Sequence, residues 1–495
     1  MIEQTKIDRL RALAIPPQKL FIGGDWKAAD REETIAVVSP IDGRVLTTIS
    51  RASAADVDRA VRAARATYNA GSWSKMSPGG RKKILLRIAE IIEARSLELA
   101  VLGVRDNGTE IGMALRAEPG SAAATFRYYA EAIDKIYGEI APTADNVLGL
   151  VHREAVGVVG AIVPWNMPLM IGAWKLAPAL AMGNSVVLKP AEAASLSLLK
   201  LAEICAEAGL PDGALNVVTG SGSVVGEAIA THMDVDVLVF TGSNGVGRKL
   251  LEYSARSNLK RVYLELGGKS PNIIFSDAPD LEKAAAVSAN GIFRNSGQVC
   301  VAGSRLLVQR DVHDDVVERI ARIASAMKVG DPLRLDTDIG AIASAGQLQS
   351  NLNFLGLAER EGARRIIGGE RILEETGGYY MRPAIFANVV QEMTIAREEV
   401  FGPLLAVIPF EDEAEAIRIA NATEYGLASA VWTSDLSTAH RMVRAINAGI
   451  VHVNTYGGSD LTVPLGGHKQ SGNGHDKSLH ALEKYTALKT AWIQL

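Results

Sequence analysis

The side chain best suited to chemistry in this sequence is the thiol of Cys300, which ends the polar turn Asn295-Ser-Gly-Gln-Val-Cys300. A thiol attacks carbon only as the thiolate, so a reactive cysteine needs backbone N–H groups or another positive potential close to its sulfur. Gly297 permits a loop that could supply such groups. A small cysteine buried in an apolar core gives the same local pattern, so spacing by itself leaves both interpretations equally open.

A second candidate is Glu265, which ends the apolar run Arg261-Val-Tyr-Leu-Glu265 just before a pair of glycines. A carboxylate at the end of a strand, next to a flexible turn, can be positioned as a general base. A helix-capping or solvated glutamate is the alternative.

The composition is that of an ordinary globular protein. The 495 residues are 48% hydrophobic and 22% charged, with a formal net charge of -4, which allows two or three domain cores and gives no basic surface for nucleic acid. Two cysteines, Cys205 and Cys300, exclude a disulfide framework and zinc-type spacing, so we expect a reducing compartment and no metal. The N-terminal residues mix acids and bases, and the most apolar run, residues 156–164, is too short for a membrane span. These features predict a soluble cytoplasmic protein with no membrane or nucleic-acid partner.

The elements that must position these residues begin with short strands at 19–26 and 35–38. Helices are predicted at 54–68, 80–95 and 97–107, with Ser53 and Ser77 near the starts of the first two. Residues 135–140 and 149–156 resemble the arms of a hairpin around a polar segment. A two-stranded arm has few core partners, so we expect it to need another subunit.

Residues 156–270 alternate between apolar strands and helices, with strands at 156–163, 185–190, 215–219 and 235–240. Strands that are apolar throughout, alternating with helices, predict a parallel sheet covered on both faces, the architecture of a dinucleotide-binding domain. The G-x-G-x-x-G fingerprint is absent; the nearest patterns are Gly220-Ser-Gly222 with Gly226, and Gly242-Ser-Asn-Gly-Val-Gly247. Ser243, at a strand-to-helix turn, could still receive a phosphate, or the glycines could serve the turn alone.

A second α/β domain is predicted after Cys300. Its strands are expected at 305–309, 384–387, 404–409, 428–432 and 449–454, and its helices at 312–327, 345–361, 413–420 and 437–446. A helix at 281–293 is expected to lead into the Cys300 loop. The C-terminal residues 488–495 look like a strand that pairs with a sheet edge.

Together with Pro164-Trp-Asn-Met-Pro168, these candidates give the sequence a resemblance to the aldehyde dehydrogenase superfamily over essentially its whole length. The motifs that carry it occur in the family's order: Leu264-Glu-Leu-Gly-Gly-Lys-Ser270, Gly297-Gln-Val-Cys300, Lys189-Pro-Ala-Glu192, Phe240-Thr-Gly-Ser243 and Glu399-Val-Phe-Gly-Pro403. The resemblance implies an α/β fold with a variant Rossmann cofactor domain (1–133 and 155–267), a catalytic domain (268–466) and a small β oligomerisation arm (134–154 and 467–495). Neither the hairpin near residues 135–155 nor the terminal strand is expected to find a partner within one chain, so we expect a homodimer or homotetramer.

The resemblance further implies roles for the catalytic residues. The Cys300 thiolate would attack an aldehyde, the Asn166 amide and the Cys300 N–H would hold the oxyanion, and Glu265 would activate the water that releases the acid. Lys175 matches a lysine thought to relay protons near the glutamate. Its alternative is a helix lysine that extends from an apolar face into solvent.

The resemblance implies NAD as cofactor, with NADP less favoured because Glu192 would lie beside the ribose 2′-hydroxyl. Lys189 and Glu192 match ribose contacts, Trp165 and Ser243 match pyrophosphate contacts, and Glu399 matches a contact of the nicotinamide ribose. Further cofactor contacts are assigned to Gly222, Leu266 and Phe401.

The C-terminal residues 432–442 and 469–484 resemble the bacterial ω-aminoaldehyde branch, which oxidises γ-glutamyl-γ-aminobutyraldehyde and guanidinobutyraldehyde types. An ω-amino or guanidino aldehyde is therefore the expected substrate, and neutral aliphatic or aromatic aldehydes stay open. The residues expected to line the substrate tunnel are Met167, Trp174, Val299, Val301, Tyr456, Asp460 and Leu465. Two other functions remain: a coenzyme-A-acylating enzyme, which Glu265 disfavours, and a catalytically silent protein of the same fold.

Overall fold

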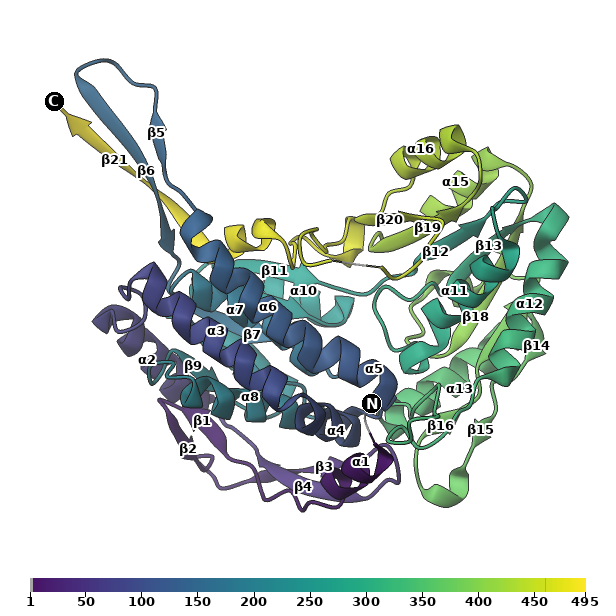
Figure 1. Cartoon of the computed structure of the whole chain (residues 1–495), viewed down its shortest axis with the longest axis horizontal. Coiled ribbons are helices and arrows are strands. Elements are labelled where there is room, and N and C mark those ends of the chain that lie inside the picture. The colour runs from purple at the N-terminus through teal and green to yellow at the C-terminus, as the bar shows by residue number, and fades with distance from the viewer. Residues whose placement is uncertain (1–2, 459) are drawn as a thin grey trace.

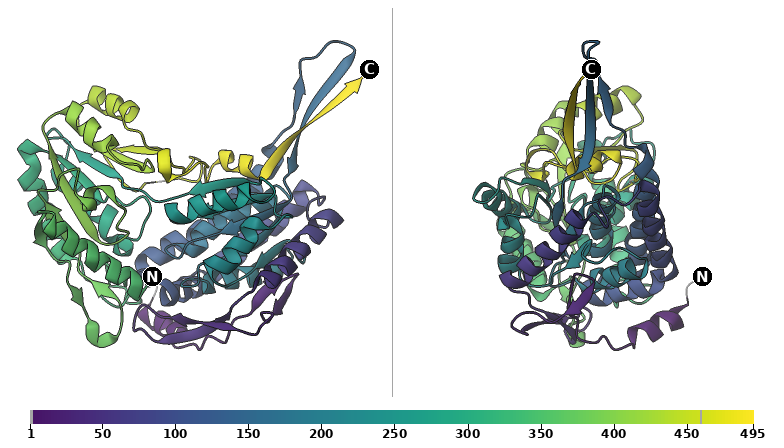
Figure 2. Two further views of the ribbon diagram at one scale, coloured as in Figure 1. Left: turned by 180° about the vertical axis from the view of Figure 1, so that it is seen from behind. Right: turned by 90° about the vertical axis from the view of Figure 1, so that its left-hand side faces the viewer.

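The computed structural model describes residues 3–458 and 460–495. Within them, two seven-stranded sheets form two lobes, and a narrow three-stranded arm projects from the first lobe (Figure 1 and Figure 2). The chain passes from the first lobe to the second after β11 and returns across both lobes to the arm at its C-terminal end. The predicted α/β fold class is confirmed.

The first sheet is parallel except at one edge. Its spatial order is β11 (Arg261–Glu265), β10 (Val237–Thr241), β7 (Val158–Ile162), β8 (Ser185–Lys189), β9 (Leu215–Val217), β1 (Leu20–Ile22) and β2 (Asp25–Lys27). The strands from β7 to β11 are parallel neighbours, whereas β1 is antiparallel to both β9 and β2. The purely parallel sheet that the pattern predicts therefore gains an antiparallel pair, which the short turn at residues 23–24 makes possible.

Helices cover both faces of this sheet, which explains why its strands are apolar throughout. Alternate residues of β8 show the division: Val186 and Leu188 belong to one buried cluster and Val187 to the other. The first cluster includes α3 (Pro78–Ala94), α6 (Ser121–Ala132), α7 (Pro168–Ala181) and α8 (Leu196–Glu207). The second includes α2 (Ala54–Ala70), α9 (Glu227–Thr231) and α10 (Asn244–Ala255).

The two predicted helix starts are confirmed by their caps. Ser53 accepts a hydrogen bond from the Asp56 N–H, and the Asp56 carboxylate accepts one from the Ser53 N–H, so α2 begins with a capping box. Ser77 caps α3 through the Gly80 N–H. Each cap satisfies backbone donors that a helix start otherwise leaves unpaired.

The second sheet repeats this plan. Its order is β14 (Arg364–Ile367), β17 (Ala384–Ala387), β18 (Leu404–Phe410), β13 (Arg305–Gln309), β12 (Pro271–Ile274), β19 (Ala428–Trp432) and β20 (Ile450–Val453), and only the edge strand β14 is antiparallel. The sequence pattern does not predict β12, because it is four residues long and begins at a proline. Parallel partners on both sides, β13 and β19, hold it in the sheet.

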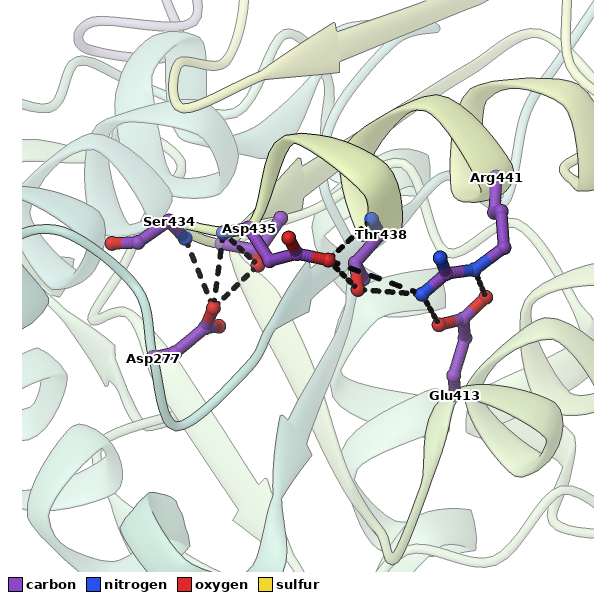
Figure 3. Close-up of polar contacts among 7 residues, drawn as sticks. Asp277, Glu413, Ser434, Asp435, Thr438 and Arg441 are labelled. Carbon is purple, nitrogen blue, oxygen red and sulfur yellow. Dashed lines mark hydrogen bonds and ion pairs between the residues drawn. The ribbon is translucent and has the colours of Figure 1, made fainter.

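The helices of the second lobe again occupy both faces. One face carries α11 (Leu281–Phe293) and α12 (His313–Ala326), and the other carries α13 (Ala345–Arg360), α14 (Thr394–Arg397), α15 (Glu413–Asn421) and α16 (Leu436–Ala445). Figure 3 shows how α16 is fixed: Asp277, beyond β12, accepts the N–H groups of Ser434 and Asp435. A bidentate pair of Arg441 with Glu413 then joins α16 to α15.

Smaller elements complete the chain. They are α1 (Gln4–Arg11), β3 (Thr34–Val38), β4 (Val45–Ser50), α4 (Ser96–Asn107), α5 (Ile111–Leu115), the π-helical turns η1 (Arg116–Gly120) and η3 (Gly222–Gly226), the hairpin β15 (Arg371–Ile372) and β16 (Tyr380–Met381), and the 3₁₀ turns η2 (Ile133–Lys135), η4 (Arg294–Gly297), η5 (Arg310–Val312), η6 (Glu374–Thr376), η7 (Lys469–Ser471) and η8 (Leu479–Tyr485). Within the described residues, no helix combines the length and apolar character needed to cross a membrane.

The arm corrects one prediction. It consists of β5 (Glu139–Ala141), β6 (Val147–Ala155) and β21 (Thr486–Gln494), and β21 pairs with β6 along its whole length within the same chain. The expectation that the hairpin and the terminal strand both lack partners inside one chain is therefore wrong, because each is the partner of the other. The first predicted hairpin arm is also shorter, since residues 133–135 form a 3₁₀ turn and pairing starts at Glu139.

The proposed domain boundaries stay a prediction. The strands of the first sheet come from 1–133 and 155–267, and those of the second from 268–466. The predicted boundaries assign residues 467–485 to the arm. These residues contain η7 and η8 and lie outside the three-stranded sheet of the arm. Gly472 in this segment forms a β-bridge with Glu265, so the segment reaches the predicted active site.

Candidate active site

The loop that carries Cys300 is wound in an unusual conformation. Three consecutive residues, Asn295, Ser296 and Gly297, have φ angles of 51°, 53° and 71°. Only glycine adopts this region without strain. At Gly297 a side chain is also excluded by space, because a Cβ would collide with the carbonyl oxygen of Gly402. The glycine predicted to allow the loop is thus required by both conformation and packing.

Hydrogen bonds bring Asn166 against this loop. The Asn166 Nδ2 donates to the carbonyl oxygen of Gln298 at 2.9 Å. The Gln298 side chain fixes its own backbone, since its Nε2 donates to the Asn295 carbonyl at 3.0 Å and its Oε1 accepts the Ala343 N–H at 2.9 Å. An amide nitrogen carries two N–H groups, and the described residues offer no second acceptor to Asn166 Nδ2. One donor of Asn166 is therefore left for a ligand beside Cys300.

The Cys300 thiol is not activated in the way that the turn suggests. The N–H groups of Cys300 and Val301 face the sulfur and favour the thiolate. Burial acts in the opposite direction, and so do the carboxylates of Glu399 and Glu265, so the pKa of the Cys300 thiol is raised to about 12. The N–H groups that the turn was expected to supply are present, but desolvation outweighs their effect on the pKa of the thiol.

Glu265 lies within electrostatic reach of this thiol, at the carboxyl end of β11. Its side chain is buried, and its Oε1 has no hydrogen-bond partner among the described residues. Burial raises the pKa of Glu265 well above its ordinary value and Asp476 adds to the effect, while Lys175 and Lys484 oppose it. A buried, unpaired carboxyl group of raised pKa is suited to taking and giving protons.

Lys175 is buried, and the alternative of a lysine reaching solvent is wrong. Its Nζ forms an ion pair with Asp476 at 2.6 Å, and Lys484 contacts the other oxygen of Asp476 at 2.6 Å. Although burial opposes ionisation, the two lysines hold the pKa of Asp476 below its ordinary value. Sequence reasoning missed Asp476 and Lys484, because no local pattern connects them with a helix 301 residues earlier.

Cys300 and Asn166 line a cavity of about 840 Å³. All the residues predicted for the substrate tunnel line it as well, namely Met167, Trp174, Val299, Val301, Tyr456, Asp460 and Leu465. Lining residues that were not predicted include Met113, Arg116, Met170, Arg294, His452 and Lys477. Their contribution to substrate binding stays a prediction.

The aromatic surfaces of this cavity are partly used by the protein itself. The Lys477 ammonium lies over the Trp174 ring, 5.7 Å from its centroid. The Tyr456 hydroxyl donates to the Val301 carbonyl at 2.6 Å, and its ring packs against His452. The Asp460 carboxylate accepts both the N–H and the hydroxyl of Thr462. Trp174, Tyr456 and Asp460 are suited to attract a cationic substrate, but each of them already has a partner within the protein.

The residues predicted to hold the adenosine ribose do come together. Lys189, at the end of β8, forms an ion pair with Glu192 at 3.0 Å, and the other oxygen of Glu192 accepts the Gly222 N–H at 2.9 Å. A Cβ at Gly222 or at Gly245 would meet open space. The helix starts at η3 and α10 therefore leave room for a dinucleotide, and Ser243 directly precedes α10 without capping it.

The remaining predicted cofactor residues face one another across the two lobes. Glu399 accepts the Gly268 N–H at 2.9 Å, and burial raises its pKa to about 7. The rings of Trp165 and Phe401 meet edge to face at 5.3 Å. Leu266 differs from the others, because its side chain is buried in the core and its N–H donates to the Ser471 carbonyl. Only the Leu266 carbonyl is left for a cofactor.

This combination of fold and site fits an aldehyde dehydrogenase: a largely parallel sheet carries the Lys189–Glu192 ion pair at the end of a strand, and the second lobe brings Cys300 to the wall of the cavity. The Aldehyde dehydrogenase family model matches residues 26–491. The chain therefore belongs to the aldehyde dehydrogenase family.

Three relatives show how similar the chain is to known proteins. The NADP/NAD-dependent aldehyde dehydrogenase PuuC of Escherichia coli (strain K12) is 48% identical over 488 residues, which cover 99% of this chain and 98% of PuuC. An indole-3-acetaldehyde dehydrogenase solved with NAD+ has a TM-score of 0.98 at 48% identity, with both chains covered completely. The gamma-glutamyl-gamma-aminobutyraldehyde dehydrogenase from Burkholderia cenocepacia J2315 has the same TM-score, identity and coverage.

Proposed function

We propose that this protein oxidises an aldehyde to its carboxylate, with NAD as the hydride acceptor and with a covalent intermediate on Cys300. The observation that carries the proposal is the arrangement around this thiol, in which one Asn166 N–H is left for a ligand and Glu265 has an unpaired oxygen. The same group of residues would have no purpose in a catalytically silent protein.

The first half of the reaction forms a carbon–sulfur bond. The Cys300 thiolate attacks the aldehyde carbon, and the carbonyl π electrons move to oxygen, which becomes the oxyanion of a thiohemiacetal. The second Asn166 N–H and the Cys300 N–H are the donors for this oxyanion. NAD, when bound, supplies the hydride acceptor that converts the thiohemiacetal to a thioester.

The second half hydrolyses the thioester. Glu265 takes a proton from water, the water oxygen bonds to the acyl carbon, and the carbon–sulfur bond breaks to return the Cys300 thiolate and release the carboxylic acid. Lys175 and Lys484 favour the ionised form of Glu265, so they assist its function as a base. Their ion pairs with Asp476 give the proton a buried chain of polar groups to follow.

For the cofactor, Lys189 and Glu192 would hold the adenosine ribose, and the α10 start with Ser243 would receive the pyrophosphate. The Glu192 carboxylate disfavours a 2′-phosphate, so NAD should bind more tightly than NADP. The relative PuuC is named for both cofactors. In Glu192→Gln, we therefore expect the ratio of Kd values for NADP and NAD to fall, and an unchanged ratio would contradict this role of Glu192.

The test of the core proposal is Cys300→Ala. This variant should bind NAD with unchanged affinity and form no NADH with any aldehyde. NADH formation at the wild-type rate would refute the assignment of the nucleophile. Product analysis with and without coenzyme A separates hydrolysis from acyl transfer to a thiol.

For the substrate we infer an aldehyde whose tail is neutral or zwitterionic, such as an acylated aminoaldehyde, in preference to a bare ammonium or guanidinium. The relatives are named for both an aromatic aldehyde and a γ-glutamyl aminoaldehyde. Among the described residues that line the cavity, Asp460 is the only acid, against Arg116, Arg294 and Lys477. The Trp174 face is already covered by Lys477, so a cationic tail would find repulsion and little cation–π support.

A panel of aldehydes ranked by kcat/KM tests this inference. The γ-glutamyl derivative of 4-aminobutyraldehyde and indole-3-acetaldehyde should both exceed free 4-aminobutyraldehyde, by about tenfold if one charge contact of 1–2 kcal/mol distinguishes them. If the free amine is the best substrate, the tail inference is wrong, while the function of Cys300 is unaffected.

A further inference from the structure

The short segment Asp106, Asn107, Gly108, Thr109 and Glu110, here called the 106–110 segment, is buried although all of its side chains are polar. The relative exposure is 1% for Asp106, 2% for Asn107 and Thr109, and 0% for Glu110. Burial of polar groups is unfavourable unless they form hydrogen bonds. No step of the proposed mechanism uses these residues, so their contacts require another explanation.

One end of the segment holds the backbone that carries the oxyanion donor. The Asn107 Nδ2 donates to the carbonyl oxygens of Trp165 and Asn166, at 3.3 Å in each case. The Asn107 Oδ1 accepts the Thr109 N–H at 3.1 Å, which fixes the orientation of the amide. The peptide units on both sides of Asn166 are thereby fixed to the 106–110 segment.

The other end holds the loop of the nucleophile. The Glu110 carboxylate accepts the Asn295 N–H at 3.3 and 3.1 Å, and the Thr109 hydroxyl donates to the Asn295 Oδ1 at 2.8 Å. Asn295 is the first of the three residues with positive φ that lead to Cys300. Its Nδ2 donates to the Gln298 carbonyl at 3.2 Å, and this is the same carbonyl that Asn166 Nδ2 contacts.

The segment itself is firmly anchored. The Asp106 carboxylate accepts the Leu196 N–H at the start of α8. Gly108 has a φ of 81°, and its carbonyl oxygen accepts the Ala341 N–H at 3.0 Å. A Cβ at Gly108 would press against Ala341 and Pro40. A rigid segment thus contacts both the Asn166 backbone and the Asn295 loop.

We propose that the 106–110 segment sets the separation of the Asn166 amide from the Cys300 loop, and that Thr109 and Glu110 are positioning residues for the oxyanion site. This inference rests on the proposed function of Asn166 and Cys300. Thr109 orients the Asn295 amide, so that Nδ2 faces the Gln298 carbonyl. Glu110 holds the strained backbone at Asn295. Neither residue needs to touch the substrate to affect the geometry of the oxyanion donors.

The test compares Thr109→Val, which removes the hydroxyl and keeps the shape, with Thr109→Ser, which keeps the hydroxyl. We expect Thr109→Val to lower kcat for aldehyde oxidation by about tenfold, less than the 10²–10³ lost with a whole oxyanion donor, and Thr109→Ser to retain most of the activity. Alkylation of Cys300 by iodoacetamide develops no oxyanion, so its rate should be the same in both variants and the wild type. The Kd for NAD should also stay the same.

Two further measurements separate positioning from general loss of structure. The double variant Thr109→Val with Asn166→Ala should be no slower than Asn166→Ala alone, because the two residues act on the same oxyanion.

If Thr109→Val does not fold, Glu110→Leu and Glu110→Gln replace the two Thr109 variants. Glu110→Gln keeps an acceptor for the Asn295 N–H, so it should retain the kcat that Glu110→Leu loses. Wild-type kcat in Thr109→Val and Glu110→Leu would overturn the inference, as would equal losses of kcat, alkylation and NAD binding. Inactivity of the wild type toward aldehydes would instead refute the proposed function.

Discussion

At the residue scale, burial disfavours ionisation of both the nucleophile Cys300 and the base Glu265. Burial raises the pKa of both groups, and the carboxylates of Glu399 and Glu265 raise the pKa of Cys300 further. Lys175 and Lys484 act in the opposite direction on Glu265. A thiol protected in this way resists oxidation and alkylation until a reaction partner changes its surroundings.

This protection predicts the pH dependence of alkylation in the free enzyme. Because the pKa of Cys300 is raised to about 12, the thiolate fraction is small at neutral pH and increases about tenfold per pH unit below that pKa. Inactivation by iodoacetamide should therefore accelerate steadily from pH 7 to the highest pH at which the enzyme is stable. Cys300→Ala, which retains the buried Cys205, is the control and should incorporate no label. A plateau below pH 8 would show that the thiolate is already formed.

Replacing the base should separate the two halves of the reaction. Glu265→Gln keeps the shape of the side chain and cannot accept a proton, so we expect a rapid burst of NADH followed by turnover lower by about 10²-fold or more. In the wild type, the deacylation rate should rise with pH, because the raised pKa of Glu265 leaves less carboxylate at low pH. This rise should be absent in the glutamine variant. Unchanged steady-state turnover would show that another group activates the water.

At the element scale, the Cys300 loop depends on positions where a side chain is not tolerated. Gly297 has a φ of 71° and contacts the Gly402 backbone, whereas Gly209, at the end of α8, has a φ of 90° and open space around its Cα. The two positions separate a purely conformational requirement from one that also includes packing.

We expect Gly297→Ala to lower the melting temperature and abolish NADH formation, since it adds a backbone collision to the left-handed conformation. Gly209→Ala is the matched control, with only the conformational cost of about 1–2 kcal/mol, and it should keep wild-type kcat. Thermal melting and NADH assays of both variants make the comparison. If both variants melt alike and keep their activity, the packing around Gly297 does not hold the loop.

At the scale of the whole molecule, the arm is the feature that one chain leaves incomplete. It projects from the first lobe (Figure 2), and several of its large apolar side chains are exposed. Ile140 is 75% exposed, Trp492 67% and Leu488 63%. Exposed apolar residues gathered on one element are typical of an interface between subunits.

We therefore predict that the protein is a homodimer or homotetramer assembled through this arm. Light scattering should give a mass that is two or four times the 52.6 kDa of the chain. The double variant Ile140→Glu with Trp492→Glu should shift the mass toward the monomer, because buried charges without partners disfavour association. Exchanging the exposed Leu13, which lies outside the arm, for Glu is the control and should leave the mass unchanged. A monomeric wild type would refute the prediction of a homodimer or homotetramer.

The cytoplasmic location of the protein also stays a prediction.

The sequence by itself determined most of the helices and strands and singled out the candidate site residues. Apolar strands that alternate with helices indicate a parallel sheet wherever they occur, and the capping residues Ser53 and Ser77 mark helix starts, because both signals depend on neighbours within a few positions. The same holds for Cys300, Asn166 and Glu265, whose motifs are local and distinctive. All the predicted tunnel residues line the cavity for this reason.

Tertiary structure alone decided the distances, the burial and the partners. Asp476 meets Lys175 across 301 residues, β21 pairs with β6 across more than 300, and Thr109 reaches Asn295 across 186. Such contacts follow from the packing of whole lobes, which no local pattern encodes. Burial also outweighs the effect of the loop N–H groups on the pKa of Cys300. The free energy of desolvation depends on everything that surrounds the sulfur and not on the residues adjacent to it in the chain.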